Sequence, residues 1–271
     1  MRSLISRKTS LWLLAILTVV VALVACMLPR IPQPLSYHQF ADRRSFLGIP
    51  NFGDVVSNLP FAIIGIWGLA LLKRSNLKQG SRHFIEPREQ WPYLAVFVGL
   101  FLTAFGSSWY HLDPNNETLV WDRLPMTVTF MGMVAAMIME RISVRLGLWL
   151  LTPLLLIGMG SVLQWHLSEV RGAGDLRFYA SVQAYSALVI LLALLFPPRY
   201  TQGRYLGYVV GFYALAKALE FFDKTIFAAL RVVSGHTLKH LAAAAAGCSI
   251  LRMVQTRNPV GDEVFPVRHG S

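Results

Sequence analysis

Residues 91–110, WPYLAVFVGLFLTAFGSSWY, form a continuous stretch without a single charged side chain. About twenty such residues in a helix match the thickness of the hydrocarbon core of a bilayer. Because lipid offers no hydrogen-bond partners, a lone segment of this kind must satisfy its backbone groups internally, as an α-helix does. The stretch therefore predicts a membrane-spanning helix.

The same pattern recurs along the chain. Further stretches long and apolar enough to cross a bilayer are 11–28, 53–72, 119–139, 146–164, 178–197, 205–222 and 234–252. The 271 residues are 55% hydrophobic and 14% charged, whereas soluble domains contain about one quarter charged residues. We expect an all-α integral membrane protein, with a seven-transmembrane-helix core preceded by one extra N-terminal hydrophobic helix.

This pattern divides the chain into four parts: an N-terminal signal-anchor or transmembrane helix (1–28), an external linker (29–52), a seven-helix domain (53–252) and a polar C-terminal tail (253–271). Basic residues followed by an apolar run make the first part similar to a signal sequence, and Leu23–Cys26 resembles a bacterial lipoprotein cleavage box. An ordinary first transmembrane helix is the favoured interpretation, because its apolar run is long enough to cross.

The net charge of +11 indicates topology and not nucleic-acid binding. Lys and Arg are scattered through short connections between apolar runs, without the basic face that binds nucleic acid. They are more frequent in alternate connections, which predicts a multi-pass protein with both termini cytoplasmic. The two cysteines, Cys26 and Cys248, form neither a disulfide framework nor a thiolate metal motif. No nucleic-acid or protein partner is predicted.

Polar residues inside the apolar stretches point to a metal site. Ser107 and His111 are four positions apart, as are His236 and His240, so each pair lies on one face of a helix. Three neutral imidazoles suit Zn²⁺ and leave its fourth position open for water, whose pKa the metal lowers to about 7. Asp122 is the candidate for proton transfer, and Ser107 for donating a hydrogen bond to a developing oxyanion. The charge asymmetry places this cluster toward the non-cytoplasmic side.

Each of these residues also has a simpler interpretation. A histidine in a membrane helix can bond to a neighbouring helix, and a small serine permits close helix packing. Asp122 can cap its helix, with Pro125 in the first turn. Three function classes remain open: an amide hydrolase, another lipid hydrolase acting on a phospholipid or a different acyl amide, and a non-enzymatic metal-binding receptor or transporter.

Three motifs and one residue pair carry a family resemblance. Gly106–His111 (GSSWYH), Asp122–Met126 (DRLPM), His236–His240 (HTLKH) and the pair Ser57-Asn58 resemble the alkaline ceramidase family, within the seven-helix membrane hydrolases that include the adiponectin receptors. The resemblance implies a zinc-dependent amidase that cleaves ceramide-like membrane lipids to a sphingoid base and a fatty acid. It implies that His111, His236 and His240 are the zinc ligands, with Asp122 in proton transfer and Ser107 beside the oxyanion.

The chain departs from this family at several positions. Arg123 stands where the family usually has Glu, and Tyr110 replaces a Phe. The segment that binds Ca²⁺ in eukaryotic members has few acids here, and two arginines follow Asp42. Because calcium prefers several carboxylate and carbonyl oxygens, a calcium site is not expected. Lys217 and Glu220, three positions apart, are predicted to form an internal ion pair.

Overall fold

The computed structural model describes residues 5–77 and 83–260. Across these residues the structure is helical, with two isolated bridges and no strand, so the expected all-α class is confirmed. The long helices are α1 (Arg7–Met27), α3 (Leu59–Leu77), α4 (Trp91–Leu112), α5 (Asn116–Arg141), α6 (Val144–Val170), α7 (Arg177–Ala193), α8 (Arg204–Phe221) and α10 (Gly235–Thr256). The shorter ones are α2 (Phe52–Val56) and α9 (Asp223–Leu230), with 3₁₀ turns at Leu35–His38 and Pro87–Gln90.

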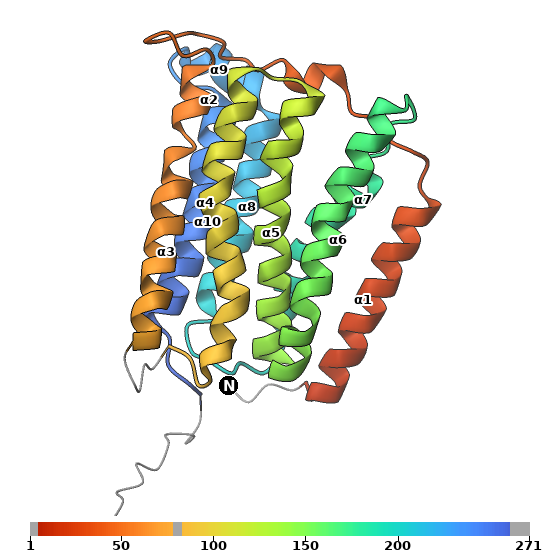
Figure 1. The fold of residues 1–271 in the computed structure, drawn as a ribbon, viewed down its shortest axis with the longest axis vertical. Helices are drawn as coiled ribbons and strands as arrows, with labels where there is room; N and C mark the ends of the chain where they lie inside the picture. The colour runs from red at the N-terminus through yellow and green to blue at the C-terminus, as the bar shows by residue number, and fades with distance from the viewer. Residues whose placement is uncertain (1–4, 78–82, 261–271) are drawn as a thin grey trace, which may run out of the picture.

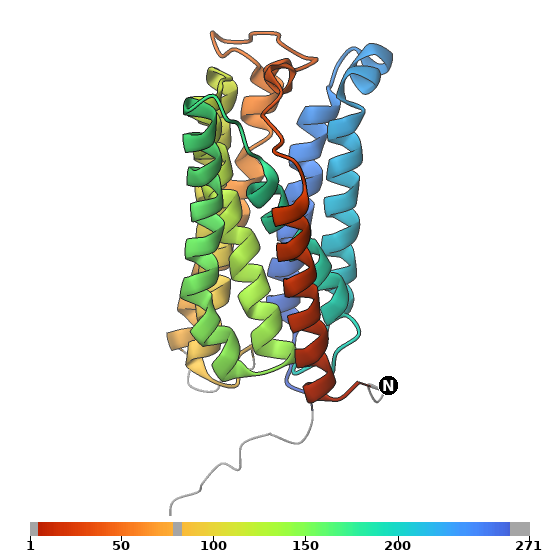
Figure 2. The same cartoon turned by 90° about the vertical axis from the view of Figure 1, so that its right-hand side faces the viewer.

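The helices from α3 onward form an upright bundle, and α1 stands beside it (Figure 1). Helix α4 packs between α3 and α5, α6 packs on α5, and α10 packs on α3 and α8. Helix α1 packs on α7, which Figure 2 shows behind it. The bundle is therefore closed around an interior to which α4, α5, α7, α8 and α10 all contribute.

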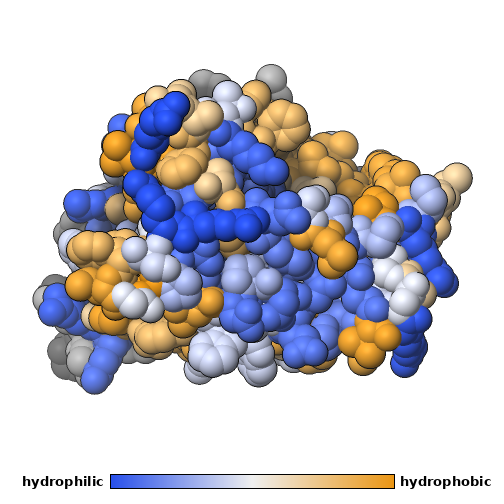
Figure 3. Space-filling view, turned by 90° about the horizontal axis from the view of Figure 1, so that it is seen from above, coloured by the Kyte–Doolittle hydropathy of each residue, from blue (hydrophilic) through white to orange (hydrophobic). Residues whose placement is uncertain are grey.

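The outer surface of the bundle is apolar, as lipid contact requires. Large side chains such as Trp12, Trp149 and Ile157 are exposed on it. Within the described residues, four helical stretches are long and apolar enough to cross a membrane: Arg7–Met27, Phe52–Ser75, Pro87–Leu112 and Val144–Val170. Seen from the end that carries α2 and α9, polar groups cover the centre of the face, and hydrophobic groups lie beside them (Figure 3). These features are those of a membrane protein.

The remaining helices of the bundle are less apolar for a structural reason. Helix α7 is apolar but has only 17 residues. Helices α5, α8 and α10 carry ionisable side chains such as Asp122, Glu220 and Lys239 that line an interior cavity. Charged groups in membrane helices usually face a bundle interior or a cavity, and the same groups lower the mean hydropathy of these helices.

Two helices begin differently from the sequence prediction. The stretch predicted as one helix over 53–72 is broken after α2, and the break carries Ser57 and Asn58. Helix α5 begins at Asn116, because the side chain of Asn115 accepts bonds from two backbone N–H groups and forms a capping box with Thr118. The alternative interpretation of Asp122 as a helix cap is therefore wrong, and its carboxylate is free for another role.

The predicted linker packs against the bundle instead of hanging away from it. Four residues of this linker are buried against the bundle: Gln33, Phe40, Asp42 and Asn51. Helix α9, which the sequence did not predict, lies at the same end of the bundle (Figure 1). Together these segments cover the end at which α4 finishes and α5 and α10 begin.

The opposite end is closed by a buried ion cluster. Helix α10 continues to Thr256, beyond the predicted boundary at 252, and Arg257 after it is buried. Its guanidinium pairs with Glu140 of α5 and bonds the hydroxyl of Tyr93. This cluster fixes the end of α10 against α4 and α5. The rest of the predicted tail, 261–271, lies outside the described residues, as do the basic residues Arg2, Lys78, Arg82 and Arg268.

Candidate metal centre

The three histidines meet at the covered end of the bundle. His111 comes from the last turn of α4, and His236 and His240 from the first turns of α10. Each pair of ring centroids is 4.9 Å apart. One ligand nitrogen from each residue lies within 4.8 Å of the other two. All three rings are buried, so the arrangement is a compact donor set shielded from water.

Glycines permit the close helix contacts that create this arrangement. A Cβ on Gly106 of α4 would lie 2.0 Å from the carbonyl oxygen of Trp121 in α5, and a Cβ on Gly235 would lie 2.3 Å from that of Leu219 in α8. Only glycine allows backbones to approach so closely. The contact at Gly106 brings Ser107 beside Asp122. The contact at Gly235 lets the start of α10 pack against α8.

A hydrogen-bond chain fixes the tautomer of His240. The Ser57 hydroxyl has one hydrogen and lies 3.1 Å from the backbone carbonyl oxygen of Asp54, which can only accept. The hydroxyl therefore accepts at its second contact, 2.7 Å from Nδ1 of His240. Nδ1 carries the proton, and the lone pair of Nε2 is left for a metal. The break between α2 and α3 is what places Ser57 here.

The linker supports the histidines from outside. The ring of Phe40 lies 4.6 Å from those of both His111 and His236. The side chain of Asn51 donates to the backbone carbonyl oxygen of His111 at 2.8 Å. Phe40 thus closes the cluster toward the outside, and Asn51 holds the end of α4.

A zinc ion fits these residues. Nδ1 of His111 is buried and has no partner among the described residues, although buried polar atoms nearly always have one. Three imidazole nitrogens are a common ligand set for catalytic zinc and leave one position open. The observations support a metal site compatible with Zn²⁺ formed by His111, His236 and His240, the residues that the sequence singled out.

Ser107 and Asp122 lie in the same cavity as His240. Both are buried, and the Ser107 side chain is a hydrogen-bond partner of the Asp122 carboxylate. A carboxylate beside an open metal position can accept a proton from bound water and deliver it to a leaving group. The structure therefore brings all five predicted residues to one end of the bundle.

The guanidinium of Arg123, the next residue after Asp122, is hydrogen-bonded to a different group. It donates to Oε1 of Gln33 at 2.7 Å and lies over the rings of Trp165 and Tyr179, 4.2 and 4.5 Å from their centroids. Stacking on aromatic faces stabilises a guanidinium away from water. Arg123 attaches the linker to α5 and forms no ion pair with Asp122 in the described part of the chain.

The sequence missed a lysine at the site. The expected pair of Lys217 and Glu220 is confirmed, with 2.8 Å between Nζ and Oε2. Glu220 also pairs with Lys239 of α10, with 2.7 Å between Nζ and Oε1. The same Nζ lies 3.3 Å from Nε2 of His236. Helical spacing indicates pairs within one helix, so it gave no signal for a pair formed between α8 and α10.

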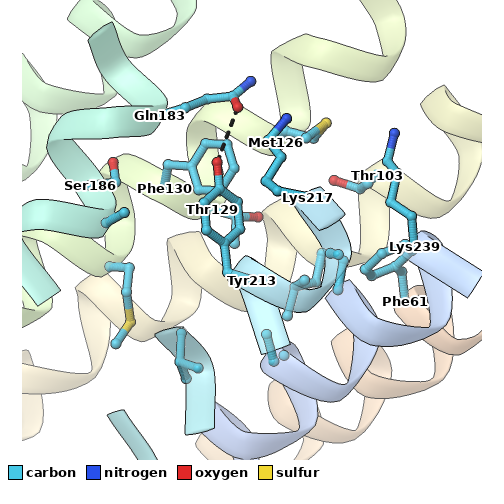
Figure 4. A pocket seen from close by; sticks show the side chains of 18 of the residues that line it. Phe61, Thr103, Met126, Thr129, Phe130, Gln183, Ser186, Tyr213, Lys217 and Lys239 are labelled. Carbon is cyan, nitrogen blue, oxygen red and sulfur yellow. Dashed lines mark hydrogen bonds between the residues drawn. The ribbon is translucent and has the colours of Figure 1, made fainter. Parts of the chain in front are cut away.

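The interior cavity extends from these ionic groups into the apolar centre of the bundle. Its polar end includes Asp122, His240 and Glu220, and its apolar part is lined by residues such as Leu100, Ile190 and Val209. Figure 4 shows Lys217 and Lys239 reaching into it from α8 and α10, and Tyr213 bonded to Gln183 across it. The cavity is thus polar beside His240 and apolar over the rest of its lining.

In the segment compared with a calcium site, Asp42 is paired with an arginine, whereas Asp54 is bonded only through Oδ1 and its Oδ2 is buried without a partner. Both carboxylate oxygens of Asp42 accept from Arg44, at 2.8 and 2.7 Å, and this guanidinium holds the pKa of Asp42 below its usual value. Asp54 accepts from the hydroxyl of Thr237 at 2.6 Å. The arginine thus supplies the positive charge that Asp42 requires.

Comparison with protein-family models and with curated proteins finds no match for this chain. The likeness to alkaline ceramidases therefore rests on the sequence motifs alone.

Proposed function

We propose that the protein is a zinc-dependent intramembrane hydrolase that cleaves long-chain lipid amides of the ceramide type into a free fatty acid and an amine. The observation that supports this most is the buried triad of His111, His236 and His240, of which His240 also lines the polar end of an apolar cavity. A purely structural metal would not need an adjoining cavity lined by a serine and a carboxylate. A transporter would need ligands along a path, whereas the described residues form one compact group.

The proposed chemistry assigns a task to each side chain. Zinc, when bound, supplies a polarised water near neutral pH and a Lewis acid for the carbonyl. Asp122 accepts the proton of the attacking water and returns it to the amide nitrogen as the C–N bond breaks. Once Asp122 is protonated, the Ser107 hydroxyl is released from it and stabilises the negative charge that develops on the carbonyl oxygen. Phe40 limits the entry of bulk water from outside.

The proposal includes a membrane topology. We take α3 to α8 and α10 as seven crossings that follow the N-terminal helix α1, with both termini cytoplasmic and the histidines toward the non-cytoplasmic side. The excess of Lys and Arg in alternate connections supports this orientation. A lipid substrate would then place its acyl chain in the apolar part of the cavity, with its amide at the metal.

The test is a substrate panel applied to the purified protein. Its zinc content is measured, and fatty-acid release is followed from ceramide, other N-acyl amides and phospholipid esters of equal chain length. Zinc-dependent release from amides is the expected result. An ester-cleaving enzyme with the same site would release fatty acid from the phospholipids only. No release from any lipid by the zinc-loaded protein would refute the proposed function.

A further inference from the structure

The polar end of the cavity holds an ionic cluster that the proposed hydrolysis does not use. Lys217 and Lys239 flank Glu220, one on each carboxylate oxygen, at 2.8 and 2.7 Å. We refer to these three residues as the Lys–Glu–Lys cluster. All three line the cavity together with Asp122 and His240. The cluster therefore adjoins the position that the scissile amide would occupy.

The cluster has more positive than negative charge. Two ammonium groups share one carboxylate in direct contact. Asp122, the other acid that lines the cavity, is hydrogen-bonded to Ser107 and forms no ion pair with either lysine among the described residues. An unbalanced charge in a membrane helix is costly unless it finds a partner. An anionic ligand would supply that partner, whereas an uncharged headgroup would not.

Lys217 has the free capacity to bind such a ligand. An ammonium group donates three hydrogen bonds, and the Lys217 side chain, bonded to Glu220, is 52% exposed. Figure 4 shows its amine directed to the same side of the cavity as that of Lys239. Arg123, a buried cation nearby, bonds to Gln33 through Nη2, lies over two aromatic rings and does not line the cavity. Lys217 is thus the group best placed to meet an incoming anion.

We propose that Lys217 and Lys239 select long-chain N-acyl amides whose amine-derived part carries an anionic group, a carboxylate or a phosphate. This inference rests on the proposed function and names the substrate class of the same site. Hydrolysis of such a lipid breaks the amide C–N bond; the carbonyl carbon takes the hydroxyl of water and the nitrogen takes its hydrogen. The anionic group stays on the released amine and undergoes no reaction.

Binding tests this inference without turnover. Dissociation constants are measured for zinc-free, full-length protein in uncharged detergent, with N-palmitoylglycine, N-palmitoyl phosphoethanolamine and the uncharged N-palmitoylethanolamine. Since hydrogen bonds to charged groups are stronger than those between neutral groups, we expect the anionic lipids to bind about tenfold tighter or more. The two anionic lipids distinguish a carboxylate from a phosphate preference.

Two variants and a control locate the effect. In Lys217→Gln the ratio of anionic to uncharged affinity should fall about tenfold, and Lys217→Arg, which keeps the charge, should restore most of it. Lys224→Gln removes an exposed lysine of α9 and should keep the wild-type ratio. Equal affinities of the wild-type protein for all three lipids would overturn the inference, as would a ratio in Lys217→Gln equal to that in the wild type.

The two proposals fail in different ways. Amide hydrolysis by the zinc-loaded protein together with equal affinities would refute the headgroup inference alone. A clear preference for the anionic lipids without hydrolysis of any amide would refute the proposed function and leave anionic lipid binding by the Lys–Glu–Lys cluster in place.

Discussion

Replacing Ser57 by Ala should weaken zinc binding although Ser57 is not a proposed ligand. Its hydroxyl lies 2.7 Å from Nδ1 of His240, in a buried position, and this bond leaves Nε2 for the metal. The loss of a buried hydrogen bond costs about 0.5–1.5 kcal/mol, and the loss of a partner that orients a metal ligand weakens affinity by about 10- to 100-fold. The two ranges overlap near a tenfold loss of zinc affinity, which corresponds to about 1.4 kcal/mol.

The assay is a zinc titration of purified protein against a chromophoric chelator at fixed pH. Ser249→Ala is the matched control, because Ser249 is a buried serine of the same helix as His240 and bonds to the carbonyl oxygen of Ala245. We expect Ser57→Ala to bind zinc about tenfold more weakly than Ser249→Ala. Equal affinities of the two variants would refute the reasoning about how His240 is oriented.

Three other predictions address the chemistry, the packing and the topology. Asp122→Asn should keep its zinc and lose about two orders of magnitude in turnover, because an amide cannot accept the proton; steady-state rates near those of the wild type would reassign Asp122. Gly106→Ala should destabilise the fold by about 1–3 kcal/mol, since its Cβ would lie 2.0 Å from a backbone oxygen, whereas Gly160→Ala, which faces open space, should not; equal melting temperatures would contradict this. In a cysteine-free background, a membrane-impermeant thiol reagent should label Glu117→Cys in intact cells and Arg145→Cys only after permeabilisation, and the reverse pattern would overturn the orientation.

The apolar stretches predicted most helices because lipid-facing residues leave a long, continuous signal. For α4 the prediction of 91–110 compares with Trp91–Leu112. The signal fails where tertiary contacts decide: the break before Leu59 and the short α9 form against neighbouring segments and have no hydropathy pattern of their own. The linker is similar, since Phe40 is buried by contacts with residues far along the chain, among them His111, His236 and Tyr110.

The candidate site was predictable where its residues share one helix. The pairs at four-residue spacing identified Ser107, His111, His236 and His240, and the structure brings them together. The partners of these residues come from other helices, so spacing could not indicate them. Ser57 bonds to a histidine far along the chain, and Lys239 pairs with a glutamate of α8. Contacts between distant segments depend on how the helices pack. Packing leaves no periodic pattern in a single sequence.

The claim that three histidines hold a catalytic zinc is tested most directly by replacing one of them. Wild-type protein, His240→Ala and the control His166→Ala, which removes a histidine of α6 outside the cluster, are purified in parallel. Bound zinc and fatty-acid release from N-acyl amides are measured on the same samples. The account predicts about one zinc per chain and amide hydrolysis in the wild type and the control, and loss of both in His240→Ala. Undiminished zinc and turnover in His240→Ala would contradict it.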